Sequence, residues 1–374
     1  MKTGVGYSKS KDSAQAGIEA VENALKESGK PSLTFLFTTD VYDQKSVFES
    51  VKELVGDSKI VGFCGGGIIT PEGVLRQGVG VCTLSGKELL VETSLQKNIN
   101  LNPHKAGEKA GEKLMASGIQ KGTVFAFPDG FTSNISETIQ GLYNTMGPDF
   151  KYAGGGAGDN LKFFKTYQFT EKGVESRALA TALIDGIEIQ TSIGHGWEPK
   201  RDPMIITNSN GKKVVEINGI TAFDSYNEQI GVIGTEKFPE YGMRYPLGFP
   251  DVSGNYLIRD PLKLNFDKSI DFVTEIPKNA VGNVMEGEII DLIKTAKNVA
   301  EKAVQNIEKP QFVLLFDCIS RYLLMGDEFE KELESIKKVI GFEVPFLGAL
   351  TFGEVGSYID VPLFHNKTVV IVVG

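Results

Sequence analysis

The most informative polar residues follow an apolar run near the C-terminus. The run FVLLF (312–316) leads to Cys318 and Arg321, which we expect at a turn from a strand into a helix. Open α/β sheets bind ligands at the carboxyl ends of their strands, where the next helix N-terminus favours anions. Arg321 could therefore hold a carboxylate or phosphate through two parallel hydrogen bonds. In the alternative, Arg321 pairs with Asp317 or Glu354 and only holds two segments of the chain together.

Glu354 lies between two glycines, Gly353 and Gly356, which indicate a tight turn and a close approach of the backbone. Its carboxylate could accept hydrogen bonds from an ammonium group. With Arg321, it would then form a pair of opposite charges suited to a zwitterion such as an amino acid. A salt bridge between Arg321 and Glu354 is the alternative interpretation.

Two glycine-rich segments resemble phosphate-binding loops without matching one. They are GFCGGGI (62–68) and AGGGAGDN (153–160). Neither fits the G-x-x-x-x-G-K-[ST] pattern, and strands rather than helices are expected to follow them. We therefore interpret them as turns at strand ends, where Asp159 and Asn160 could line a pocket.

Histidine and cysteine allow two further hypotheses. His195, in GHGWEP, is the best of three histidines for an axial haem ligand, although the chain has no C-x-x-C-H signature. A structural, hydrogen-bonded His195 is the alternative. Cys318, His365 and Glu354 supply the residue types of a Cys–His–carboxylate triad, but nothing in the sequence brings them together. We expect a protein that is not an enzyme and has no metal site.

The composition limits the remaining classes. The 374 residues include 39 Lys and Arg against 48 Asp and Glu, a net charge of −9, which disfavours nucleic-acid binding. Three scattered cysteines indicate a reducing compartment. The N-terminus lacks the apolar region of a signal peptide, and no apolar run approaches the ~18 residues that a membrane helix needs. We expect a cytoplasmic protein without a membrane segment.

A repeated pattern predicts the fold. A helix, a strand, a helix and a glycine-rich strand occur at 16–67 and again at 106–160, with Phe35 and Phe37 matching Phe125 and Phe127. Further apolar, strand-like runs follow each copy, and a fainter third copy covers 296–374. The pattern predicts an α/β fold of two related mixed-sheet domains with flanking helices. We expect residues 1–195 to form an internally duplicated domain (1–97 and 98–195), and residues 196–374 to form the second.

The sequence resembles the FIST family (F-box and intracellular signal transduction) over almost its full length. The N-terminal half resembles the family's N-terminal domain through VGFCGGGI (61–68) and AGGGAGDN (153–160). The C-terminal half resembles its C-terminal domain through LLFDCISRYLLMG (314–326) and VPFLGALTFGEVG (344–356). The resemblance implies a sensory, ligand-binding role, with amino acids among the proposed ligands. It also implies haem binding and a nitric oxide response in some members.

The sequence therefore predicts a stand-alone sensor that binds a small molecule, an amino acid or a related metabolite, and passes the signal to a protein partner. The predicted ligand-binding residues are Arg321, Glu354, Cys318, Gly353, Asp159 and Asn160. The alternatives are a haem sensor that uses His195, a protein-interaction scaffold, and a Cys-dependent enzyme. The sequence leaves the oligomeric state open.

Overall fold

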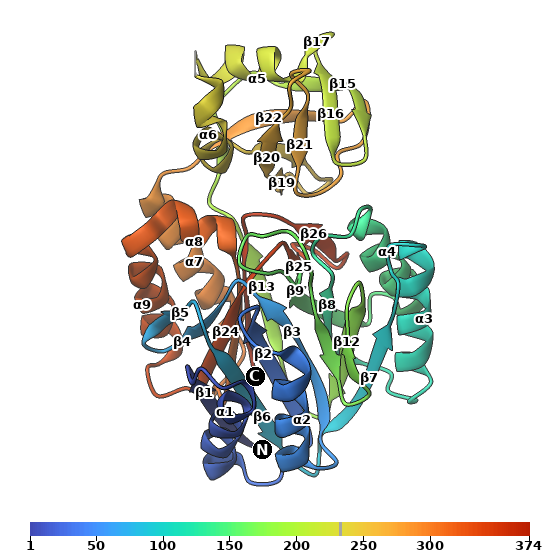
Figure 1. Ribbon diagram of the computed structural model, residues 1–374, viewed down its shortest axis with the longest axis vertical. Helices are drawn as coiled ribbons and strands as arrows, with labels where there is room; N and C mark the ends of the chain where they lie inside the picture. The colour runs from blue at the N-terminus through green and yellow to red at the C-terminus, as the bar shows by residue number, and fades with distance from the viewer. Residues whose placement is uncertain (232–233) are drawn as a thin grey trace.

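The computed structural model describes residues 1–231 and 234–374, which form a three-sheet body and a smaller lobe (Figure 1). We define the body as residues 1–197 and 287–374, and the lobe as residues 198–286 between them. Both chain termini lie in the body, away from the lobe (Figure 1). Among the described residues, no helix has the length and apolar character needed to cross a membrane.

The body consists of three units built on one order of elements, namely strand, helix, strand, helix, strand, hairpin, strand, to which the third unit adds a short helix before its last helix. The first unit contains β1 (Lys2–Ser8), α1 (Ser13–Ser28), β2 (Leu33–Thr39), α2 (Gln44–Val55), β3 (Lys59–Gly65), β4 (Gly67–Thr70), β5 (Gly73–Leu75) and β6 (Val79–Ser85). The second contains β7 (Leu90–Gln96), α3 (Pro103–Met115), β8 (Gly122–Pro128), α4 (Ile135–Met146), β9 (Phe150–Gly155), β10 (Gln168–Thr170), β11 (Gly173–Glu175) and β12 (Leu179–Asp185).

The third unit begins before the lobe and continues after it. It contains β13 (Gln190–Gly194), α7 (Ile289–Val304), β23 (Val313–Cys318), α8 (Ile319–Met325), the 3₁₀ turn η2 (Gly326–Glu328), α9 (Phe329–Ile340), β24 (Phe346–Thr351), β25 (Glu354–Gly356), β26 (Leu363–His365) and β27 (Val369–Val373). Helix α9 buries Phe329, Leu333, Ile336 and Ile340, the apolar face that its sequence spacing predicts.

Local sequence explains where the helices start and stop. The carboxylates of Asp12 and Asp43 accept the backbone N–H groups of Gln15 and Ser46, and so cap α1 and α2. Both helices end at a glycine with positive φ, which provides the C-terminal cap. Asn102 caps α3 in the same way through the N–H of Lys105.

The hairpin of each unit pairs with the sheet of a neighbouring unit. Strand β10 of the second unit pairs with β3 of the first, β25 of the third pairs with β9 of the second, and β4 of the first pairs with β24 of the third. Each six-stranded sheet also starts with the strand that precedes its unit's first helix: β1, β7 or β13. The three units therefore form a closed ring in which every sheet contains strands from two units.

Equivalent residues of the three units meet in the core. The rings of Phe37, Phe127 and Phe316 are buried, and their centroids lie 5.4–6.0 Å apart. Such aromatic pairs add to the ~1.5–3 kcal/mol that the burial of each large apolar side chain contributes. The strands that carry these rings, β2, β8 and β23, pair in parallel with β3, β9 and β24. These three partner strands carry Gly62, Gly154 and Gly348 at equivalent positions, where each glycine faces a carbonyl oxygen of the adjacent strand.

The lobe is a mostly antiparallel sheet with short helices. It contains β14 (Glu198–Pro199), β15 (Met204–Asn210), β16 (Lys213–Ile217), β17 (Ile220–Thr221), α5 (Ala222–Ile230), η1 (Thr235–Lys237), α6 (Phe238–Arg244), β18 (Leu247–Pro250), β19 (Tyr256–Arg259), β20 (Pro261–Leu264), β21 (Ile270–Phe272) and β22 (Val281–Glu286). It has its own apolar core, which includes Tyr226, Phe238 and Phe272.

The structure confirms the mixed α/β class and the duplication, but it divides the chain differently from the sequence prediction. Residues 289–374 do not form a separate domain with residues 196–288. They return to the body, where β27 pairs with β13 and β24 pairs with β4. The reason is the exchange of hairpins, which makes the third unit part of the same ring as the first two. Only the lobe, residues 198–286, stands apart.

Candidate functional site

Arg321 lies on α8, directly after β23, as the sequence predicts. Its guanidinium is fully buried and is held by protein groups on three sides. Nε donates to Asp317 Oδ1 at 3.1 Å, Nη1 donates to the carbonyl oxygen of His195 at 2.6 Å, and Nη2 donates to Glu332 on α9. Burial raises the pKa of both carboxyl groups, most strongly that of Glu332. Arg321 therefore takes the pairing role with Asp317, the alternative noted from the sequence.

Glu354 belongs to a different hydrogen-bond network. Thr351 Oγ1 donates to Oε1 at 2.7 Å, and the backbone N–H and Oγ1 of Thr368 donate to Oε2 at 3.1 and 2.8 Å. Burial raises the pKa of Glu354 to about 8. The expected pair of opposite charges with Arg321 is not formed, because each side chain is satisfied by its own protein partners.

Asp159 and Asn160 lie in a loop that only the second unit has. This insert loop, residues 156–167, separates β9 from β10, whereas one or two residues separate the equivalent strands of the other units. The buried Asp159 carboxylate accepts the backbone N–H groups of Lys162, Phe163, Phe164 and Lys165, and so shapes the loop. Asn160 bonds to Arg76. Both residues therefore fix the insert loop, and neither lines the cavity described next.

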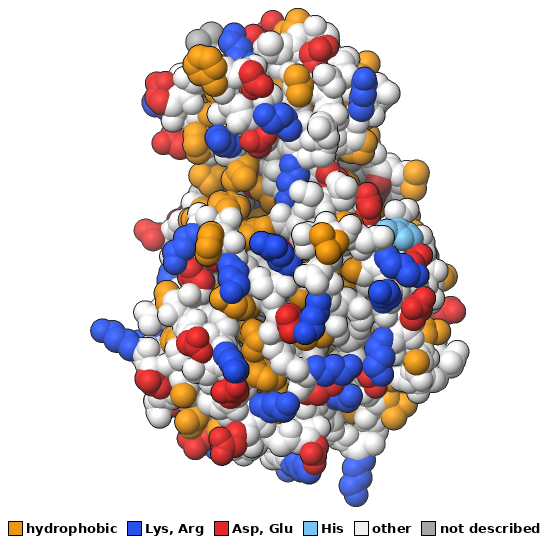
Figure 2. Space-filling view, turned by 45° about the vertical axis from the view of Figure 1, so that its right-hand side comes forward, with side chains coloured by type: hydrophobic (Ala, Val, Ile, Leu, Met, Phe, Trp, Pro, Cys, Tyr) orange, Lys and Arg blue, Asp and Glu red, His pale blue; other side chains and the backbone are white. Residues whose placement is uncertain are grey.

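An apolar cavity of about 250 Å³ lies between the body, the lobe and the insert loop. Figure 2 shows hydrophobic side chains gathered where the lobe meets the body. This waist cavity is lined from the lobe by Pro239, Met243, Asp260, Pro261, Leu262 and Val273, from the body by Cys318, Ile319, Ser320, Leu323, Phe352, Gly353 and Asn366, and from the insert loop by Leu161 and Phe163. The structure thus brings Cys318 and Gly353 together in one cavity, and leaves Arg321 and Glu354 outside its lining.

Gly353 has the backbone that the sequence suggests. Its φ of +97° favours glycine, and a Cβ there would lie 2.3 Å from the ring of Phe364. The chain therefore turns from β24 into β25 beside the cavity at a residue that has no side chain.

A buried charge pair lies beside the waist cavity, and one of its members, Asp260, belongs to the cavity lining. Lys367 Nζ lies 3.2 Å from Asp260 Oδ1 and donates to Ser320 Oγ at 2.6 Å and to the carbonyl oxygen of Met243 at 2.7 Å. Lys367 is fully buried, and Asp260 is 5% exposed. Asp260 Oδ1 accepts no well-aligned hydrogen bond from the described residues. This oxygen is itself enclosed by the protein, and Lys367 Nζ is its ion-pair partner.

Sequence reasoning missed Asp260 and Lys367. Both follow strand-like runs, YLIR and LFHN, and a charged residue at the end of such a run marks a strand end. Their pairing joins the lobe to the body across the waist, and no local pattern predicts that contact.

The residues of the Cys–His–carboxylate hypothesis are all buried, but their contacts do not form a triad. Burial raises the pKa of the Cys318 thiol well above its usual value, and the nearby carboxylates of Glu354 and Asp260 add to that rise. The thiolate, which is the nucleophile, is therefore disfavoured. His365 Nε2 bonds to the carbonyl oxygen of Gly356 at 3.1 Å, and burial lowers its pKa to about 3.

His195 does not have the surroundings of a haem ligand. Its Nδ1 accepts the backbone N–H of Trp197 at 2.9 Å, and burial lowers its pKa to about 4. It lines neither the waist cavity nor the other cavities described below. Within residues 1–231 and 234–374, no group of three or more His, Cys, Asp or Glu side chains could hold a metal ion.

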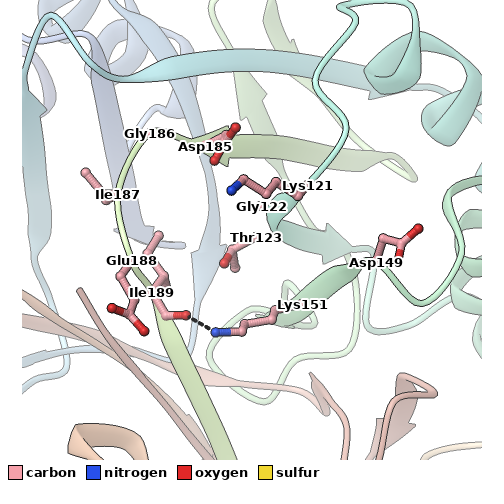
Figure 3. Close-up of a pocket in the computed structure, with 10 residues that line it drawn as sticks. All are labelled: Lys121, Gly122, Thr123, Asp149, Lys151, Asp185, Gly186, Ile187, Glu188 and Ile189. Atoms are coloured by element: carbon pink, nitrogen blue, oxygen red, sulfur yellow. Dashed lines mark hydrogen bonds between the residues drawn. The ribbon is translucent and has the colours of Figure 1, made fainter. Parts of the chain in front are cut away.

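A polar cavity of about 490 Å³ lies at the other end of the second sheet (Figure 3). Its lining includes Lys121, Asp149, Lys151, Asp185 and Glu188. The Lys151 ammonium already donates to the carbonyl oxygen of Ile189, the contact drawn in Figure 3. Strands β8 and β9 begin here, whereas ligands of α/β sheets bind where parallel strands end. We therefore take the waist cavity as the candidate site.

Comparison with known proteins gives two family matches. A model described as the FIST N domain matches residues 32–220, and one described as the FIST C domain matches residues 222–357. The two matches meet inside the lobe, and not at residue 195.

The relatives found by sequence include uncharacterized proteins of two organisms. One, from Methanocaldococcus jannaschii, is 22% identical over 96% of this chain and 77% of its own length. Another, from Mycobacterium tuberculosis, is 22% identical over 98% of both chains. Among solved structures, PurL of T. maritima complexed with FGAR aligns over 99% of this chain and 72% of its own, at 9% identity and a TM-score of 0.23, too low to indicate a shared fold.

Proposed function

Because the chain belongs to the FIST family of signal-transduction sensory domains, we propose that it binds a small molecule in the waist cavity and acts as a sensor. The observation that carries the proposal is the composition of the cavity wall, which combines the body, the lobe and the insert loop. A ligand there contacts all three parts at once. Its binding therefore depends on how the lobe sits on the body, which is what a sensor requires.

The lining favours a ligand with a compact apolar body and one amino group. The cavity volume of about 250 Å³ is below the ~300–1,000 Å³ of sites for drug-sized ligands, which fits a small metabolite. Apolar side chains dominate its surface, and Asp260 is the one carboxylate among its described lining residues, where an amino group could approach it. Amino acids with apolar side chains, and the related amines, have this chemistry. Asp260 then takes the role that the sequence assigned to Glu354.

The signal would be a shift in the position of the lobe. Polar contacts hold the lobe on the body: Arg259 Nη1 donates to the carbonyl oxygen of Phe364 at 3.1 Å, and Thr274 Oγ1 donates to Asn366 Oδ1 at 2.9 Å. A ligand that contacts both sides favours the closed arrangement by its differential affinity for that arrangement. We propose that a protein partner reads this arrangement, and that Cys318 contributes packing and no catalysis.

Calorimetric titration tests the proposal. The panel contains leucine, phenylalanine, isoamylamine and glycine, with haemin as a separate arm. We expect binding of the apolar amino acids or the amine and not of glycine. Leu262→Trp, which fills the cavity from its rim, should abolish binding, and Leu101→Trp, at a site 79% exposed, should not. Equal binding by both variants, or no binding by the unaltered protein, would refute the proposal, and so would a Soret band with haemin.

A further inference from the structure

We propose that a second cavity, on the second unit of the body, binds a small anion that carries a flat apolar group. This cavity has a volume of about 560 Å³, and we call it the insert cavity because the insert loop forms one wall. Its lining includes Arg177, Lys165, Ser133, Ser176, Phe131 and Phe164. The two cavities share one lining residue, Phe163, but the ligand proposed here differs in charge from that of the waist cavity.

Within the described part of the chain, Arg177 is the arginine whose side chain has no protein partner. The chain has six arginines. Among residues 1–231 and 234–374, Arg177 alone makes no side-chain hydrogen bond or ion pair, whereas the other five bond to Asn160, the carbonyl oxygen of Gln229, Glu288, the carbonyl oxygen of Phe364, and Asp317. Arg177 is an exposed side chain in the wall of the cavity, where its guanidinium can meet an anionic ligand in a chain of net charge −9.

The backbone conformation of Arg177 also supports a binding role for this residue. Its φ is +52°, a left-handed conformation that is uncommon for residues other than Gly, Asn and Asp. Strain of this kind persists where the surroundings fix it, and it concentrates at binding sites.

The third unit contains a precedent for what a cation at this position binds. Lys367 is the equivalent of Arg177. Lys367 lies two residues before β27, Arg177 lies two residues before β12, and each of these strands follows the hairpin of its unit; both residues have positive φ. Lys367 faces the carboxylate of Asp260 at 3.2 Å and the hydroxyl of Ser320. In the third unit, the lobe supplies that carboxylate. In the second unit, a cavity takes its place, which leaves room for the carboxylate or phosphate of a ligand.

The other walls fit the rest of the ligand. The Phe131 and Phe163 rings lie 5.3 Å apart, and Phe164 is 86% exposed, so flat apolar surface borders the cavity. Hydroxyl groups of Ser133 and Ser176 offer hydrogen bonds to an anion. Among the described lining residues the one carboxylate is Asp129, which accepts the backbone N–H of Phe131 and the hydroxyl of Thr132, both at 3.0 Å.

Titration calorimetry at low ionic strength tests the inference. Phenyl phosphate and benzoate are the probes, and inorganic phosphate and benzyl alcohol report on the anionic and apolar parts separately. We expect one of the aromatic anions to bind more tightly than either partial probe. Arg177→Gln should weaken that binding at least tenfold, as expected for the loss of a charge-assisted, two-point contact. Lys172→Gln removes an exposed charge near the tip of the same hairpin and should leave the affinity unchanged.

Two further variants separate the possible failures. Arg177→Gly relieves the left-handed backbone and still removes the guanidinium, so it should fold at least as well as Arg177→Gln and bind as weakly. Leu262→Trp, which fills the waist cavity, should bind the aromatic anion normally. The inference is wrong if neither aromatic anion binds, if benzyl alcohol binds equally well, or if Arg177→Gln retains the parental affinity.

Discussion

Arg321 Nε and Asp317 Oδ1 lie 3.1 Å apart, and both side chains are completely buried. Together with Glu332 on α9, they connect the end of β23 to two helices of the third unit. A buried ion pair of this kind contributes little net stability when it is intact, but it is costly to break, because the remaining charge loses its partner.

The first prediction concerns this cluster. Arg321→Ala should lower the free energy of unfolding by about 3–5 kcal/mol, since it leaves Asp317 and Glu332 buried without a cation. Arg201→Ala, at an exposed site on the lobe, should cost less than about 1 kcal/mol. Urea denaturation measures both changes. Similar values for the two variants would contradict the structural role of Arg321.

The second prediction uses the raised pKa of Glu354. Its folded-state pKa of about 8 exceeds the ordinary value of 4.5, so the folded protein holds a proton that the unfolded chain releases in this range. Its contribution to stability is therefore complete below pH 4.5, falls as the pH rises, and is lost above pH 8. Glu354→Gln should remove this component, with a slope of at most about 1.4 kcal/mol per pH unit. Denaturation curves between pH 5 and 9 test it, and an unchanged slope would contradict it.

The third prediction concerns His195, which is partly buried, and His365, which is fully buried. Burial lowers the pKa of His195 to about 4 and that of His365 to about 3, below the ordinary 6.5. Both rings should stay neutral down to pH 5 in the folded protein, whereas the unfolded chain gains protons below pH 6.5. Stability from these groups is therefore lost as the pH falls. Nuclear magnetic resonance of the imidazole signals decides the point: titration of either ring near pH 6.5 would show that it is not buried as described.

The fourth prediction compares two glycines of the second unit. Gly154 and Gly173 have similar φ values of +151° and +137°, but a Cβ at Gly154 would lie 2.1 Å from the carbonyl oxygen of Ala126, and one at Gly173 would meet nothing within 4 Å. Gly154→Ala should therefore lower the free energy of unfolding by about 1–3 kcal/mol more than Gly173→Ala does. Because backbone strain is matched, equal losses would show that the strand spacing at Gly154 is not tight.

Much of the fold could be predicted because the repeat shows in short segments of the sequence. The spacing of Phe35 and Phe37 against Phe125 and Phe127 identified two units whose rings meet in the core. The third copy was also visible in the sequence. Its place in the ring was not, because the pairing of β4 with β24 joins segments that no short-range pattern relates.

The candidate site could be predicted only in part. The strand-to-helix turn at Cys318 and the tight turn at Gly353 follow from local residues, and the structure places both at the waist cavity. The partners of Arg321 and the pairing of Asp260 with Lys367 are tertiary contacts between distant elements. Charged residues at strand ends look alike in a sequence, whether their charge faces a ligand or another side chain.

The exchange of hairpins also sets the order in which the body can be completed during synthesis. Strands β1, β2, β3 and β6 can pair as soon as the first unit has left the ribosome, but the hairpin β4–β5 must wait for β24, near the end of the chain. Until then, its edge is unpaired and able to join other chains. The nascent protein should therefore be most prone to aggregation between completion of its first unit and release of its C-terminus, and slow translation would lengthen that interval.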